Sequence, residues 1–156
     1  MKTASLSEIK KDLRYKSKEE LQTLCLQLAK FKKESKEYLT YLLFEADNED
    51  LFISTVKQEI SDLFQEMNTD SFFYVKKSTR KILRLTKKYI RFSKQKQTEV
   101  ELLLHFTSEL LNIKPNITQN TVLKNMYLKQ LEMAQKAASK LHPDIQFEYE
   151  NRFNGT

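Results

Sequence analysis

The chain has 156 residues, a formal net charge of +6 and 31% charged residues, which suits one domain with a buried core. It contains a single glycine, Gly155, and two prolines, so tight turns that need a positive φ are scarce and helices are favoured. The same scarcity excludes glycine-rich phosphate loops, because the backbone of such loops must approach phosphate more closely than a side chain allows.

Three helices are predicted in residues 1–44 from capping signals that precede apolar residues at three-to-four spacing. The first is a short leading helix over about 5–15. Ser17 and Glu20 form a capping box that opens the second helix, and the third begins at Ser35 or Lys36. The apolar residues on one side of the second and third helices are Leu21, Leu24, Cys25, Leu28 and Phe31, followed by Tyr38, Leu39, Leu42 and Leu43.

Two longer helices are predicted next. Asp47 and Asn48 are cap residues for the first of them, and Asp70 or Ser71 caps the second. The residues of the first that are predicted to face inward are Leu51, Phe52, Val56, Ile60, Leu63 and Met67.

The C-terminal part of the chain contains two more predicted helices and a tail. Thr98 caps one helix, which ends near Pro115 because the residue before a proline disfavours the helical conformation. The other begins at Thr118 or Asn120 and ends before the tail, residues 143–156. Apolar residues alternate with polar ones in the tail, at Ile145, Phe147 and Tyr149. This alternation predicts an extended segment laid against the helices.

The predicted fold is all-α, with six or seven helices in a single domain over residues 1–156. A faint internal similarity at an offset of 61 residues raises the alternative of two tandem three-helix units, about 17–68 and 71–141. Tandem units would stack as an armadillo-like or HEAT-like array, whereas helices joined by short loops would form a compact bundle. The sequence leaves both arrangements open.

The most unusual stretch is residues 76–96, in which ten of twenty-one positions are Lys or Arg and none is acidic. On a helix, with about 100° per residue, nine of these charges fall within an arc of roughly 140°. The nine residues are Lys76, Lys77, Arg80, Lys81, Arg84, Lys87, Lys88, Arg91 and Lys94. Without this stretch the chain has 17 basic and 21 acidic residues, so the net positive charge comes entirely from it.

This basic face has several interpretations. Like charges four residues apart repel one another, so the first explanation is neutralisation by acids of the preceding helix, Glu59, Asp62 and Glu66, or simple exposure to solvent. A nucleic acid or another polyanion is the second. It would be held through its phosphates without sequence preference, because few aromatic side chains accompany the charges. An acidic protein and an anionic lipid surface are the remaining interpretations.

The sequence shows no catalytic or metal-binding motif. Glu101 and His105 predict a hydrogen-bonded structural pair, because a di-iron bundle needs Glu-x-x-His twice and the chain has none. Cys25 lies among leucines and is predicted to be a small core residue and not a nucleophile. We therefore expect no enzyme activity, no cofactor and no metal.

The longest uncharged apolar run, residues 39–44, is too short to cross a bilayer, and residues 1–13 lack the apolar region of a signal peptide. With one cysteine and no disulfide framework, the sequence predicts a cytoplasmic protein. Its predicted function is that of a non-enzymatic binding or scaffold module with an unknown protein partner. The alternative is sequence-indifferent binding of nucleic acid or another polyanion through the basic face of residues 76–96.

Overall fold

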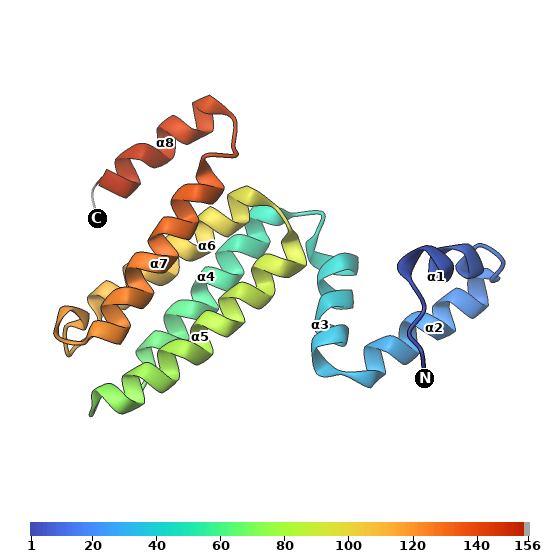
Figure 1. Ribbon diagram of the computed structural model, residues 1–156, viewed down its shortest axis with the longest axis horizontal. Coiled ribbons are helices and arrows are strands. Elements are labelled where there is room, and N and C mark those ends of the chain that lie inside the picture. The colour runs from blue at the N-terminus through green and yellow to red at the C-terminus, as the bar shows by residue number, and fades with distance from the viewer. Residues whose placement is uncertain (155–156) are drawn as a thin grey trace. The chain divides into compact units, whose positions relative to one another are not determined.

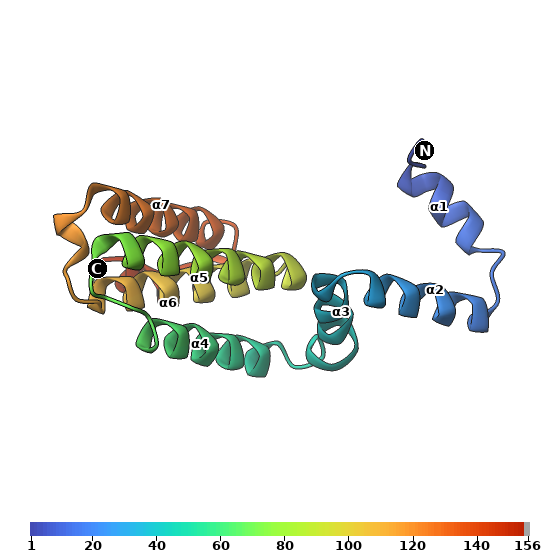
Figure 2. The same cartoon turned by 90° about the horizontal axis from the view of Figure 1, so that it is seen from below.

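The computed structural model describes residues 1–154, so the last two residues of the predicted tail lie outside the described part. The described residues contain eight α-helices and no β-strand, which confirms the all-α class with one helix more than the upper expected number. The contacts within the chain group it into two compact units, Met1–Phe44 and Glu45–Thr156 (Figures 1 and 2). None of the helices in residues 1–154 combines the length and the apolar character needed to cross a membrane.

The first unit consists of three α-helices followed by a π-helical turn. They are α1 (Leu6–Leu13), α2 (Lys18–Phe31), α3 (Lys33–Thr40) and the π-helix η1 (Tyr41–Glu45). The hydroxyls of Ser5 and Ser17 accept hydrogen bonds from the backbone N–H groups of Glu8 and Glu20, whose carboxylates accept from the serine N–H groups in return. Both helices therefore begin with a capping box, as predicted at Ser17.

The helices of the first unit bury very little. No residue of α1, α2 or α3 is buried. Phe31 is 78% exposed and Leu28 is 65% exposed, although both belong to the apolar side of α2. Cys25 is exposed, so its predicted place in the core is wrong. Helices α1 and α2 are therefore defined by their caps and backbone hydrogen bonds and not by a core.

The second unit is a compact helical bundle, which is one of the two arrangements that the sequence left open (Figure 1). It contains α4 (Glu49–Gln65), α5 (Phe72–Ser93), α6 (Lys96–Asn112), the 3-10 turn η2 (Ile117–Gln119), α7 (Thr121–Ala138) and α8 (Pro143–Asn154). Helix α6 contacts α4, α5 and α7 (Figure 2), and α8 packs on α7 (Figure 1).

Helix α6 lies at the centre of the bundle because of its composition. Its own apolar residues are spread around the helix and do not form a single stripe. Its buried residues are Thr98, Val100, Leu102, Leu103, Leu104, Phe106, Thr107 and Leu110. Phe106 packs on Phe64 of α4 with ring centroids 5.6 Å apart. Thr98 does not cap α6 as predicted. It lies inside the helix, and its hydroxyl donates to Glu49 of α4 at 2.6 Å.

Residues 143–154 form helix α8, so the extended tail predicted there is wrong. The prediction followed the alternation of Ile145, Phe147 and Tyr149, whereas a helix places residues four apart on one side, as with Ile145, Tyr149 and Phe153. Tyr149 is buried in a cluster with residues of α6 and α7, and Ile145 and Phe153 pack against it. Phe147 is 68% exposed. A proline begins the helix, where its missing N–H is not needed.

Candidate binding surfaces

The predicted basic face lies on α5. The other side of this helix buries Val75, Thr79, Ile82 and Thr86. Both threonine hydroxyls donate hydrogen bonds to backbone carbonyls four residues earlier, so neither buried hydroxyl lacks an acceptor. Of the nine predicted basic residues, the exposed ones are Lys77, Arg80, Lys81, Arg84, Arg91 and Lys94, and the half-buried ones are Lys76, Lys87 and Lys88.

Acids of α4 do not neutralise most of the basic face. Glu59 accepts a hydrogen bond from the Tyr89 hydroxyl at 2.9 Å, and Asp62 accepts one from Gln58 at 2.8 Å. Six of the nine basic side chains form no ion pair or hydrogen bond within residues 1–154, and these are Lys76, Lys77, Arg80, Lys81, Arg84 and Lys94. The repulsion between like charges at these positions is therefore not offset inside the described chain.

A second group of lysines lies beside this face. Lys129 and Lys136 are seven residues apart on one side of α7, and Lys140 follows just after its end. The two helices meet at Lys87 of α5, whose Nζ lies 4.0 Å from Sδ of Met133. Burial lowers the pKa of Lys87, and the positive charge of Lys129 lowers it further. We call the basic residues of α5 and α7 together the α5–α7 basic surface.

Sequence reasoning missed the lysines of α7. Their seven-residue spacing was a visible signal, but Glu132 stands between Lys129 and Lys136, so the segment does not stand out by charge. Nothing in the sequence indicates that α7 lies beside α5. Packing of both helices against α6 brings the two sets of charges together.

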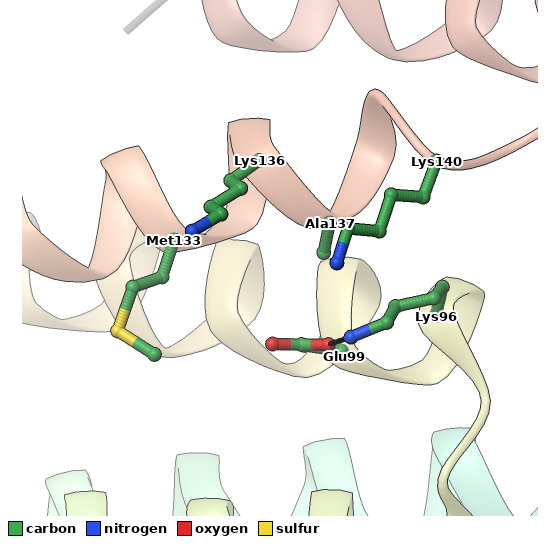
Figure 3. Close-up of a pocket in the computed structure, with 6 residues that line it drawn as sticks. All are labelled: Lys96, Glu99, Met133, Lys136, Ala137 and Lys140. Carbon is green, nitrogen blue, oxygen red and sulfur yellow. Dashed lines mark hydrogen bonds and ion pairs between the residues drawn. The ribbon is translucent and has the colours of Figure 1, made fainter.

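A pocket of about 260 Å³ lies between α6 and α7 (Figure 3). It is lined by Lys96, Glu99, Met133, Lys136, Ala137 and Lys140. Lys96 and Glu99 belong to the first turn of α6, and the other residues lie at the end of α7. Nζ of Lys96 is 2.9 Å from Oε2 of Glu99. Lys136 and Lys140 form no ion pair within residues 1–154, so the lining has an excess of positive charge.

Ser61, His105 and Glu109 form a polar cluster between α4 and α6. Ser61 Oγ lies 2.8 Å from His105 Nε2 and 3.0 Å from Glu109 Oε1. The hydroxyl donates to the Glu109 carboxylate, and the direction of its hydrogen bond with His105 is set by which ring nitrogen carries the proton. Burial lowers the pKa of His105, although the charge of Glu109 opposes this.

Glu101, the predicted partner of His105, has other partners, so that predicted pair is wrong. Glu101 accepts hydrogen bonds from Lys57 of α4, from the Tyr149 hydroxyl at 2.6 Å and from Arg152 at 2.8 Å. Burial opposes its ionisation, but the three hydrogen bonds outweigh burial and lower the pKa of Glu101 to about 2. Because Tyr149 and Arg152 belong to α8, this carboxylate joins α4, α6 and α8.

The first unit exposes large apolar side chains on α1, α2 and η1. Those that are more than half exposed are Leu6, Leu26, Leu28, Phe31, Leu43 and Phe44. Between α2 and α3 lies a pocket of about 250 Å³, lined by Cys25, Leu28, Ala29, Ser35, Tyr38, Leu39 and Leu42. We call these exposed residues and this pocket the N-terminal apolar surface. An apolar area of this kind marks an interaction site on a folded protein.

Comparison of the chain with protein-family models, with curated proteins and with solved structures gave no match. Residues 1–154 contain no group of three or more His, Cys, Asp or Glu side chains that could hold a metal ion. Function is therefore inferred from the two surfaces.

Proposed function

We propose that the chain is a non-enzymatic helical binding module, and that its N-terminal apolar surface binds an amphipathic helix of another polypeptide. The observation that carries this proposal is the exposure of large apolar side chains along α2, with Phe31 78% exposed and Leu28 65% exposed. Recognition of this kind places the apolar side of one helix in an apolar groove of another protein. The pocket between α2 and α3 offers such a groove.

The short helices of the first unit support a partner that covers their apolar side chains. Helices α1, α2 and α3 have 8, 14 and 8 residues, and helices shorter than about 12–15 residues are marginal in water without tertiary packing. Full burial of one Leu or Phe side chain stabilises by about 1.5–3 kcal/mol. Two or three such side chains covered by a partner would therefore stabilise the first unit substantially.

Introduction of negative charge on α2 tests this proposal. Leu28→Glu combined with Phe31→Glu should abolish binding, because it places two carboxylates in the apolar surface. The matched control is Arg80→Glu combined with Arg84→Glu on α5, which should leave binding intact. Circular dichroism of all three proteins should be the same, because each substituted side chain is exposed.

Binding is measured in two steps. A protein recovered from a lysate of the cells that make the chain is purified, and its complex with the chain is sized by light scattering. A defined complex lost only with the α2 variant supports the proposal. A dimer of the chain that the α2 variant converts to monomers identifies a second copy as the partner. A monomeric chain whose recovered proteins are the same for all three variants would rule out this surface.

A second candidate function is the binding of a nucleic acid through its phosphate backbone on the α5–α7 basic surface. The observation that favours it is that the basic residues of α5 lie next to the lysines of α7. Lys87 of α5 contacts Met133 of α7 and lies close enough to Lys129 for the two charges to interact. Without acids to offset them, adjacent cations are better accommodated by a bound polyanion than by solvent alone. About six phosphate contacts would make the logarithm of affinity fall with the logarithm of salt concentration at a slope near −5.

A gel shift with double-stranded RNA at low and moderate salt tests this candidate. The variant carries Lys77→Glu, Arg80→Glu, Lys81→Glu and Arg84→Glu, which are exposed and have no ion pair within residues 1–154. It should lose the shift, while the α2 variant described above should keep it. Absence of any shift by the native chain at low salt would remove this candidate.

A further inference from the structure

We propose that the pocket between α6 and α7 is a separate site for a phosphomonoester that also carries a hydroxyl group. The pocket is lined by Lys96, Glu99, Met133, Lys136, Ala137 and Lys140 (Figure 3). This proposal does not depend on protein binding by the first unit. It rests in part on the second candidate function, because the pocket lies at one end of the α5–α7 basic surface, but its test separates the two.

The antiparallel course of α6 and α7 creates the pocket. Lys96 is the first residue of α6, and Lys136 and Lys140 lie at the end of α7, so the start of one helix lies beside the end of the other. Figure 3 shows the side chain of Lys140 extending from the end of α7 toward α6, where Lys96 reaches Glu99 along its own helix. Residues more than 35 positions apart in the sequence thus place ammonium groups around one cavity.

The charges in the pocket are not balanced within residues 1–154. Glu99 is the one acidic residue of the lining and is paired with Lys96 at 2.9 Å. Lys136 and Lys140 are four residues apart and have no ion pair there, so they repel each other. The helix dipole explains part of this pattern, because cations are favourable at the end of α7. It does not explain Lys96, which stands at the positive end of α6.

The lining indicates the chemical class of the ligand. A phosphomonoester carries close to two negative charges and three acceptor oxygens, which match the ammonium donors of Lys136 and Lys140. Met133 and Ala137 offer an apolar wall for the carbon part of an ester. The Glu99 carboxylate only accepts hydrogen bonds, so it favours a ligand with a hydroxyl over a bare anion. The volume of about 260 Å³ leaves room for such a substituent beside the phosphate.

The test is a titration of the full chain with glycerol 3-phosphate, followed by backbone amide NMR. We expect shifts of the amide signals of residues 96–99 and 133–140. Inorganic phosphate should bind more weakly, and glycerol should not bind. Lys136→Gln combined with Lys140→Gln should weaken binding by about a hundredfold, because each of the two lost charged hydrogen bonds is worth about a factor of ten. Both side chains are exposed, so the fold should be unchanged.

The matched control is Lys77→Gln combined with Lys81→Gln on the exposed side of α5, which should leave glycerol 3-phosphate binding unchanged. Equal weakening by the two double variants would show general charge attraction and overturn the site. Absence of shifts at residues 96–99 and 133–140 would also overturn it. Absence of an RNA gel shift by the native chain, together with glycerol 3-phosphate binding, would refute the second candidate function alone.

A second experiment distinguishes whether the phosphate belongs to a nucleic-acid end or to a small molecule. Double-stranded RNA with 5′-phosphates is compared with the same RNA carrying 5′-hydroxyls. Tighter binding of the phosphorylated RNA, abolished by Lys136→Gln with Lys140→Gln, identifies a nucleic-acid end as the ligand. Equal binding of both RNAs, together with the glycerol 3-phosphate shifts, identifies a small phosphorylated molecule.

Discussion

Replacement of Glu101 by Gln should destabilise the second unit and loosen α8. Glu101 is the shared acceptor of Lys57, Tyr149 and Arg152, and its side chain is only 16% exposed. Its pKa falls from 4.5 to about 2 in the folded chain. At 1.36 kcal/mol per pKa unit, this difference corresponds to about 3 kcal/mol of stability at neutral pH.

The stability difference between the native chain and Glu101→Gln should depend on pH. A carboxyl group whose pKa is lower in the folded state stabilises fully above the pKa of the unfolded chain and loses that stabilisation as pH falls to the folded pKa. The difference between the native chain and Glu101→Gln should therefore be about 3 kcal/mol at pH 7 and should vanish between about pH 4.5 and pH 2. Glutamine cannot ionise, so the variant lacks this dependence.

Urea unfolding followed by circular dichroism at several pH values measures the difference. Hydrogen exchange should also become faster in α8 of the variant, since two of the three donors to Glu101 lie there. The matched control is Glu150→Gln, an exposed residue of α8, which should change stability by less than about 0.5 kcal/mol. A loss of the same size at pH 7 and at pH 3 would refute the electrostatic reasoning, because a pH-independent loss indicates altered packing.

The remaining predictions concern the core, the polar cluster and the N-terminal apolar surface. Phe106→Ala should cost about 3–5 kcal/mol in urea unfolding because its side chain is fully buried, whereas Phe31→Ser should change stability by less than about 0.5 kcal/mol. His105→Gln should flatten the decline in stability as pH falls below about 6.5, since the buried imidazole has a lowered pKa and the unfolded chain takes up the proton first. Cys25 should react with a maleimide in the folded chain and become protected when the partner is bound. Unchanged labelling in the complex would place the partner elsewhere.

Short-range features of the sequence predicted much of the secondary structure correctly. The capping signals at Ser17, Asn48 and Asn120 mark observed N-caps whose side chains accept backbone hydrogen bonds, and Ser71 is the N-cap of α5 without such a bond. A cap needs only a side chain and the backbone a few residues away, so a cap can be recognised in the sequence without knowledge of how the helices pack. The prediction that Thr98 caps α6 is wrong because its hydroxyl donates to Glu49, a distant residue of α4, and makes no cap on its own helix.

The assignments that failed were those in which a residue could satisfy two patterns. Residues 145–153 fit both an alternating and a helical spacing, and burial of Tyr149 against α6 and α7 decides for the helix. His105 could pair with Glu101 along its own helix, but Ser61 and Lys57 on α4 supply competing partners for the two side chains. Local spacing cannot rank a neighbour in the same helix against one in another helix.

Composition and local pattern were therefore sufficient to establish the all-α class, most helix starts and the basic side of α5, because each depends on residues within a few turns of one another. Three other features depend on contacts between helices distant in sequence. These are the meeting of Lys87 with Lys129 and Met133, the lysine-lined pocket between α6 and α7, and the apolar residues of the first unit that remain exposed. An apolar stripe has the same appearance in sequence whether it faces its own core or solvent, so only the packed chain shows which stripe is left for a partner.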